Sequence, residues 1–378
     1  MQVLQKQPVC STVLWVLAWT AVMGAVQEPS ESPVPTLASI FEQGAILEDR
    51  NGDGVTDFVN VRFVLGDPPS ASDVAAAANV AARLGFESMA INLPLADAAA
   101  DAPIVAIGAA GMARAGLSPA AFGLDALAAG EGLVTVTRVE GLPAIVIAGP
   151  DAAGTRAAAE LFAARLPKVW DPKGAVLTDV IRAIAEFLDA PTGAIDVTNV
   201  RVTAGGSAIN RLDVTVKFDA VDTLQQAEAA LNDLVVARVT DGGDAASDND
   251  QALSYPGALM LQINLVADGA AVSIDLPRAV GPDPQPLGVR PGSGPKRSLD
   301  LSSVYANDGF LGDGNSDLIP DRTDILLVPS GHGIVRTIDL AARIGLETTG
   351  LSLPLALPAE AVEDAGSLPT LVLIGMDH

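Results

Sequence analysis

The stretch "AARLGFESMAINLPLA", residues 81–96, decides the fold because it returns as "AARIGLETTGLSLPLA" at residues 341–356. Two other blocks recur around it in the same order. The acidic "LEDRNGDGVTDF" that begins at Leu47 aligns with "LGDGNSDLIPDR" that begins at Leu311, and "PIVAIG" is repeated as "PTLVLIG". Three blocks in one order indicate a duplicated domain, since self-similarity over a long period marks a repeated structural unit.

Length and charge limit the kind of protein this is. The 378 residues exceed the usual single core of about 100 to 200 residues, so two or three domains are expected. The net charge of −24 repels phosphate backbones and anionic lipid headgroups, which excludes nucleic acid as a partner. The hydrophobic share of 49% is too high for a disordered acidic chain, so the chain is expected to fold.

Residues 1–25 have the layout of a signal peptide, with an apolar run over residues 12–26 followed by small residues. The run is shorter than the roughly 20 residues that span a bilayer. We therefore expect cleavage near Ala25, with an uncleaved anchor as the alternative, and a secreted or periplasmic product without a membrane segment. Cys10, the only cysteine, lies in the removed part, so the mature chain has no thiol for a disulfide or a zinc site.

Alternating strand and helix patterns predict an α/β fold built from a duplicated layered domain. In "SASDVAAAANVAARLG", Ser70 or Ser72 is the expected N-cap, apolar residues follow at helical spacing, and Gly85 is the expected C-terminal stop. From residue 194, two strands, a helix and two strands predict a small α+β domain.

Only three residues follow "PTLVLIG", so we expect the second copy to be truncated and the natural product to continue. The expected parts are a Pro-rich linker at 26–36, α/β copy 1 at 37–190, the small α+β domain at 194–279, a Pro/Gly linker at 280–298 and partial copy 2 at 299–378.

Oxygen-bearing side chains recur at every second position of the first acidic block, in the order of ligands 1, 3, 5, 7 and 9 of a calcium loop. Gly54 stands at the sharp turn of that loop, but Asn60 replaces the bidentate Glu of an EF-hand. The block therefore resembles the shorter "DxNxDGxxD" calcium turns that precede strands in extracellular bacterial repeats. The candidate ligands in this copy are Asp49, Asn51, Asp53, the carbonyl of Val55, and Asp57.

The second acidic block repeats this spacing of oxygen-bearing side chains. Leu318 stands in place of the glycine, while Asp324 restores a carboxylate at the last position. A structural calcium ion is the sharper interpretation of both blocks, and a solvated Asx-rich turn is the alternative. The candidate ligands in this copy are Asp313, Asn315, Asp317, the carbonyl of Ile319, Asp321 and Asp324.

Residues able to carry catalysis are scarce, and no catalytic residue is predicted. His332 and His378 are the only histidines, and neither is followed by the Glu of a zinc-hydrolase motif. Ser330 precedes His332 in "SGHG", which favours a surface loop over a catalytic triad. The strand-to-helix turn "AGPDAAGT", ending at Thr155, lacks the Lys of a P-loop and favours a plain turn.

Two longer segments carry a resemblance to known families. "GLVTVTRVEGLPAIVIAGPDAAGTRAAAELFAARLP", from Gly132, resembles non-catalytic α/β domains that precede the barrel of secreted polysaccharide-degrading enzymes. "LDLSSVYANDGFLGDGNSDLIPDRTDILLVPSGHG" is similar to the N-terminal repeat region of large secreted bacterial proteins of the zinc carboxypeptidase class, of carboxypeptidase A type. The resemblance implies a zinc peptidase domain downstream of His378. The family's His-x-x-Glu motif is absent here, so no catalytic residue is carried over.

Three functions compete on this basis. The first is a non-catalytic accessory or scaffold region of a secreted multidomain hydrolase that positions a polymeric substrate, with calcium-stabilised turns. The second is a module without enzymatic chemistry, either a cell-envelope assembly part whose partner is an envelope protein or a polysaccharide-binding accessory domain. The third is an enzyme with its site between the copies, which the shortage of convergent polar groups disfavours.

Overall fold

The computed structural model places the described residues in one unit, Val34–His378, with a mixed α/β fold, as predicted. The predicted signal peptide, the linker at 280–298 and both histidines lie outside the described residues, as does Asn315. The structure describes residues 35–37, 39–90, 92–97, 99–164, 177–203, 209–240, 260–276, 302, 304–305, 309–313, 316–330, 334–362 and 371–375.

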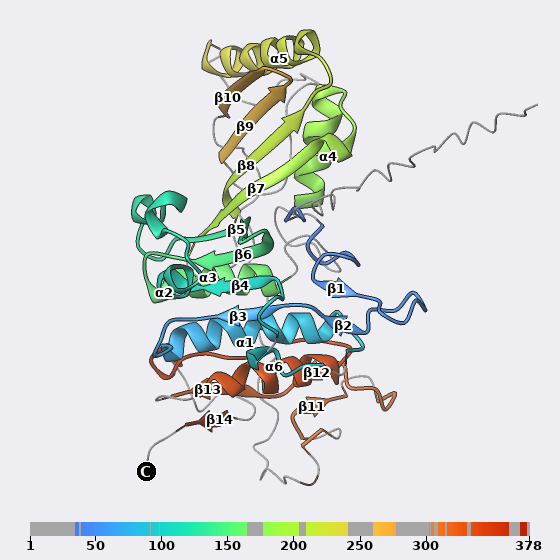
Figure 1. The fold of residues 1–378 in the computed structure, drawn as a ribbon, viewed down its shortest axis with the longest axis vertical. Helices are drawn as coiled ribbons and strands as arrows, with labels where there is room; N and C mark the ends of the chain where they lie inside the picture. The colour runs from blue at the N-terminus through green and yellow to red at the C-terminus, as the bar shows by residue number, and fades with distance from the viewer. Residues whose placement is uncertain are drawn as a thin grey trace, which may run out of the picture. The chain divides into compact units, whose positions relative to one another are not determined.

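An eight-stranded mixed sheet forms the main framework, in the order β10-β9-β8-β7-β5-β6-β4-β3 (Figure 1). Strands β3, β4 and β6 run parallel, and β5 pairs antiparallel with both β6 and β7. The strands are β3 (Arg62–Val64), β4 (Ile104–Ile107), β5 (Gly132–Val139), β6 (Leu142–Ala148), β7 (Ile195–Val202), β8 (Ile209–Lys217), β9 (Met260–Ala267) and β10 (Ala270–Leu276).

The β5–β7 pairing carries the sheet from copy 1 into the small α+β part. The described residues between 194 and 276 form the expected two strands, helix and two strands, with β8 and β9 parallel. Because Leu133 of β5 pairs with Arg201 of β7, the strands on both sides of residue 190 belong to one hydrogen-bonded sheet. The two predicted parts therefore share a backbone framework.

Helices cover this sheet, and the first of them begins where local sequence predicts. Helix α1 (Ala71–Phe86) starts at Ser70, whose hydroxyl accepts a 3.0 Å hydrogen bond from the backbone N–H of Asp73. The other helices of this part are α2 (Gly108–Arg114), α3 (Ala152–Ala163), α4 (Leu177–Leu188) and α5 (Val221–Thr240). Short 3₁₀ turns are η1 (Leu95–Asp97), η2 (Pro119–Phe122), η3 (Leu124–Ala126), η4 (Thr192–Ala194), η6 (Ile334–Arg336) and η7 (Ala359–Ala361).

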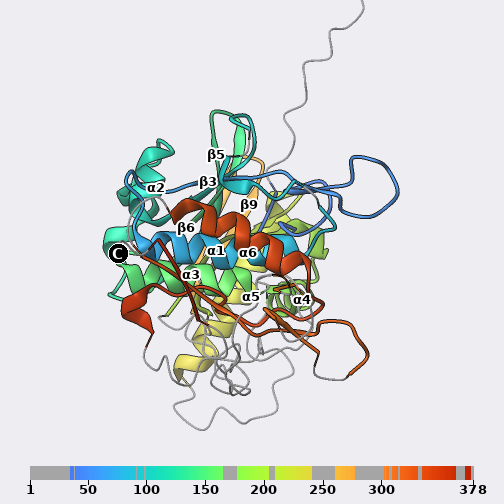
Figure 2. The same cartoon turned by 90° about the horizontal axis from the view of Figure 1, so that it is seen from below.

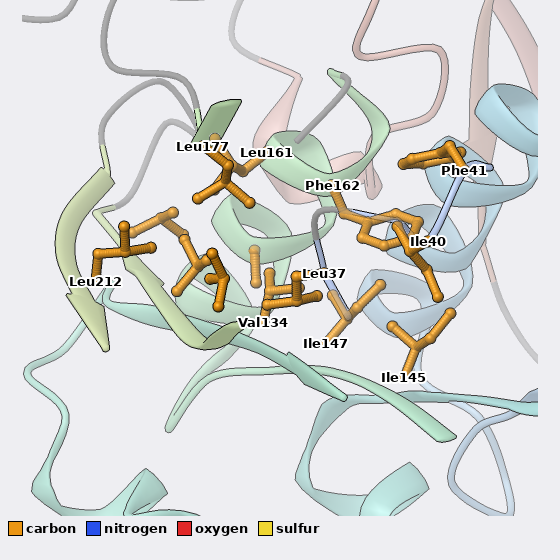
Figure 3. Close-up of a cluster of buried hydrophobic side chains, with 14 of the residues drawn as sticks. Leu37, Ile40, Phe41, Val134, Ile145, Ile147, Leu161, Phe162, Leu177 and Leu212 are labelled. Carbon is orange, nitrogen blue, oxygen red and sulfur yellow. The ribbon is translucent and has the colours of Figure 1, made fainter. Parts of the chain in front are cut away.

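The largest apolar core lies between the sheet and helices α1, α3, α4 and α5 (Figure 3). The rings of Phe41 and Phe162 pack with centroids 5.0 Å apart, and both side chains are fully buried. The same cluster continues to Leu177 of α4 and Leu212 of β8. Copy 1 and the α+β part are thus stabilised by one continuous core, since burial of apolar surface is the main favourable term in folding.

The second copy repeats strands β1 to β4 and helix α1 of the first. In both copies the first two parallel strands pair in the same aligned register, Arg62 with Ile104 in copy 1 and Leu326 with Leu371 in copy 2. The duplication read from the sequence is therefore a duplication of structure. Strands β1 (Leu47–Glu48), β2 (Phe58–Val59), β3 and β4 and helix α1 correspond to β11 (Leu311–Gly312), β12 (Arg322–Thr323), β13 (Leu326–Pro329), β14 (Leu371–Ile374) and α6 (Thr337–Leu346).

Helices α1 and α6 lie between the main sheet and the β13–β14 pair (Figure 1). Seen from below, α3, α1 and α6 lie side by side (Figure 2). None of the helices in the described ranges is both long and apolar enough to cross a bilayer.

Candidate functional site: the acidic loops and the interface between the copies

The first acidic loop connects the antiparallel strands β1 and β2, and Asp49 holds it together. One carboxylate oxygen of Asp49 accepts from the backbone N–H of Gly52 at 2.6 Å and of Asp53 at 3.2 Å, and the other accepts from Gly54 at 2.7 Å. The hydrogen bond from Gly54 is the largest cause that lowers the pKa of Asp49 below 3.8. The carboxylate at ligand position 1 therefore organises the turn backbone.

The other candidate ligand side chains of this loop also bind backbone donors. Asn51 Oδ1 accepts from the N–H of Asp53 at 2.9 Å, and Asp53 Oδ1 accepts from the N–H of Val55 at 2.8 Å. Asp57 Oδ1 accepts from the N–H of Arg50 at 2.9 Å. The Asx-turn interpretation is thus visible in the geometry, although a carboxylate oxygen has a second lone pair and can accept more than one partner.

The second acidic loop repeats this arrangement. The carboxylate of Asp313 accepts from the N–H of Ser316 at 2.6 Å and from the N–H of Leu318 at 2.8 Å, and Asp317 accepts from the N–H of Ile319 at 2.8 Å. Ser316 and Leu318 have φ values of 64° and 73°. Their counterparts in copy 1 are glycines, so the same turn is made here by residues that disfavour it.

The positions that follow the two loops differ between the copies. Asp324, the carboxylate predicted at the last ligand position, accepts from Arg322 Nε at 2.9 Å. In copy 1, Asn60 Nδ2 donates to Glu48 Oε1 at 2.5 Å. Asp321, like Asp57, closes its loop with its backbone N–H, which donates to the Gly312 carbonyl at 2.9 Å.

As placed, the acidic side chains do not form a preorganised metal cage. Among the residues that the structure describes, no three Asp, Glu, His or Cys side chains form a group that would hold a metal ion. Calcium at these loops therefore stays a prediction.

The strain in the second loop yields a direct prediction. Leu318→Gly should raise the free energy of unfolding by about 0.5 to 1 kcal/mol. A left-handed conformation costs an L-residue about 1–2 kcal/mol, and the larger conformational entropy that glycine loses on folding offsets part of this gain. The Leu318 side chain is 81% exposed, so the change removes no core contact. Gly54→Ala, at the matching position with φ 86°, should lower it by about 1 kcal/mol. Urea unfolding of both variants checks the opposite signs, and two changes of the same sign contradict the prediction.

Aligned positions of the two copies meet at a second site, between α1 and copy 2. Asn79 is fully buried, and its Nδ2 donates to the carbonyl of Ala356 at 2.9 Å. Its Oδ1 accepts from the N–H groups of Leu355 at 2.8 Å and Ala356 at 2.9 Å. One amide side chain therefore satisfies three backbone groups in the "LPLA" segment of the other copy.

The reciprocal contact comes from copy 2. Asp339 aligns with Asn79, and its Oδ1 accepts a 2.9 Å hydrogen bond from the N–H of Ala96. Ala96 is the counterpart of Ala356 in the "LPLA" of copy 1. Each copy therefore caps the same backbone segment of the other, which is the pattern of an interface with approximate twofold symmetry.

The helix contact obeys the same symmetry. A Cβ on Gly85 would overlap the carbonyl of Ala342, and a Cβ on Gly345 would overlap the carbonyl of Ala82, each far closer than 3.0 Å. Ala82 aligns with Ala342 and Gly85 with Gly345, so α1 and α6 cross in opposite directions through an identical Ala-x-x-Gly pair (Figure 2). Gly85 lies inside α1, which ends at Phe86, so its role as a terminal stop was wrong; it permits close backbone approach.

The arginine of the "AARxG" motif is present in both copies, but its surroundings differ. Arg83 and Arg343 each pair with the Glu four residues later, Glu87 and Glu347. Arg83 is almost fully buried, and its Nε donates to the carbonyl of Ala163 at the C-terminal end of α3. The helix dipole stabilises a cation at this end. The Arg343 side chain is 47% exposed.

The remaining sequence candidates are internal turns. Asp151 caps α3 by accepting from the N–H of Gly154 at 2.7 Å, and its other oxygen accepts from Gly130 at 2.9 Å. The Thr155 hydroxyl accepts from the N–H of Gly149 at 3.1 Å. The turn "AGPDAAGT" thus uses its own side chains to satisfy its amides, as expected of a plain turn.

No protein-family model, curated protein or solved structure matches this chain. The resemblance to the carboxypeptidase-type repeat region therefore rests on the quoted motifs alone.

Proposed function

We propose that this chain is a non-catalytic scaffold region of a secreted multidomain protein, built by pairing two copies of one α/β unit. What supports the proposal is the use of aligned positions in the two copies. Asn79 and Asp339 bind the opposite "LPLA" backbone, and Gly85 and Gly345 allow the helices to touch. The motifs that recur in both copies thus hold the two copies together, which is a structural role.

The parent protein in this proposal is a hydrolase of the zinc carboxypeptidase class, as the resemblance implies, and the scaffold positions a polymeric substrate for it. Zinc would belong to that catalytic domain. The alternative is a cell-envelope module whose partner is an envelope protein.

Activity and binding assays on the purified exported chain test the proposal. We expect no turnover of peptide or glycan substrates and saturable binding to a peptide or glycan array. Saturable capture of an envelope protein without array binding would favour the alternative. Turnover that a single substitution inside the chain abolishes, while the surface change Gly193→Ala leaves it intact, would show that the chain is an enzyme.

The proposal also includes a structural calcium ion bound at each of the two acidic loops. The support is that both copies repeat the same spacing of oxygen-bearing side chains and the same turn geometry, around Asp49 and Asp313. Binding would recruit the free lone pairs of these oxygens and require Asp53 and Asp57 to turn toward the ion. The ion would stabilise the turns without entering any reaction.

Thermal unfolding in calcium and in chelator tests the ion. An ion bound only by the folded state stabilises by about 2.7 kcal/mol at a hundredfold excess over the dissociation constant. We expect the parent chain to melt higher in calcium, and Asp53→Ala to lose that increment. The control, Asp101→Ala, removes an equal charge from an exposed position outside the loops and should keep it. Parent and Asp53→Ala melting alike in calcium and in chelator would reduce the loop to an Asx turn.

A further inference from the structure

The two sides of the interface between the copies use aligned positions, so copy 1 itself carries the groups through which α6 contacts it. Copy 1 presents Gly85 and Ala82 to the same two residue types on α6, and the N–H of its Ala96 donates to Asp339, the residue aligned with Asn79. In a twofold interface, residue i contacts residue j and residue j contacts residue i. Helix α1 of a second molecule can therefore take the place of α6 on this face.

The chemistry of the contact favours such exchange. Copy 1 makes its own polar contact through the N–H of Ala96, which donates to Oδ1 of Asp339. Asn79 of a second copy carries the equivalent Oδ1 at the aligned position. The helix contact demands only small residues at two positions, and copy 1 has both. The partner in trans thus needs no residue that copy 1 lacks.

We propose that the α1 face, formed by Asn79, Ala82, Gly85 and the segment 93–96, is a homotypic docking surface whose partner is a second copy of the same unit. In this chain copy 2 occupies it in cis. When copy 2 is blocked, copy 1 of a second chain occupies it. This inference goes beyond the scaffold role and holds whether or not the chain recruits a substrate.

Tethering explains why the pairing is internal in the parent chain. Two surfaces on one chain meet at an effective concentration of about 1 mM when the connection can span them. A second molecule at micromolar concentration competes poorly against that value. Removing the internal competitor is therefore the way to expose the face.

The test uses the full chain carrying Gly345→Gln, which puts a side chain where α6 must touch the backbone of Ala82. By sedimentation at about 10 to 100 μM, below the tethered concentration, this variant should be a dimer. The parent chain and Gly193→Gln, a change at an open surface position, should be monomers.

Two further readouts assign the dimer to this face. Amide protection of residues 71–86 in Gly345→Gln should increase with protein concentration, because a second molecule then covers α1. Mixing Gly345→Gln with Gly85→Gln should give heterodimers, since one chain presents the α1 face and the other the α6 face. A monomeric Gly345→Gln, or a dimer in which protection of 71–86 is independent of concentration, overturns the proposal. In the Gly345→Gln chain both readouts use α1 of copy 1, so they hold even where this substitution unfolds copy 2.

Discussion

Asn79→Ala should lower the free energy of unfolding by about 4 kcal/mol. The substitution leaves the two N–H groups of Leu355 and Ala356 and the carbonyl of Ala356 without their partner. Both residues are fully buried, so water cannot replace the amide, and each unsatisfied buried group costs about 1–3 kcal/mol. The sum is less than additive because the "LPLA" segment can relax. Denaturant unfolding, with amide exchange at residues 355 and 356, measures the loss.

The matched control comes from the other copy. Asp339→Asn keeps the Oδ1 that accepts from the N–H of Ala96 and gives up the ion pair with Arg336. The Arg336 side chain is 63% exposed, and pairs of this kind contribute at most about 1 kcal/mol. A loss below about 1 kcal/mol is therefore expected. Equal losses for Asn79→Ala and Asp339→Asn would show that charge or local helix stability, and not the backbone capping, dominates at these positions.

Gly85→Ala should cost about 3 kcal/mol, at the upper end of what overpacking usually costs. The added methyl meets the carbonyl of Ala342, which is main chain and cannot rotate away, so α1 and α6 must separate. The usual gain of about 1 kcal/mol from replacing a helical glycine by alanine is already counted in this value.

Gly345→Ala should have a similar effect, because its methyl meets the equivalent carbonyl of Ala82. Gly193→Ala, at a position with no atom near the new methyl, should be neutral or slightly stabilising. Denaturation midpoints of the three variants provide the measurement. If Gly85→Ala unfolds at the midpoint of Gly193→Ala, the helices do not meet as closely as the structure places them.

Much of the secondary structure follows from local signals. The run from Ser70 predicts a capped helix because its hydroxyl satisfies an N-terminal amide and its apolar residues fall on one face. Short β-branched runs such as "GLVTVTRV" predict strand β5 over its full length. The alignment of "AARLG" with "AARIG" predicts that the copies share a fold, and the matching strand registers confirm it.

The function of the acidic loops is only partly readable from the sequence. The spacing of Asp49, Asn51 and Asp53 predicts a turn rich in side-chain oxygens, and that turn is present. Whether an oxygen faces an ion or a backbone amide depends on side-chain rotation, and spacing does not determine it. The metal prediction for these residues is therefore left to the calcium experiment.

By itself, the sequence determined many of the strands and helices and that one unit occurs twice, because periodicity and capping act over a few residues. Only the tertiary structure decided what covers each apolar face. It joined β5 to β7 in one sheet and set α1 against α6. Gly85 shows the reason: at the end of an apolar run, local signals alone predict a helix stop. Its use depends on the carbonyl of Ala342, more than 250 positions away, and no local pattern contains that contact.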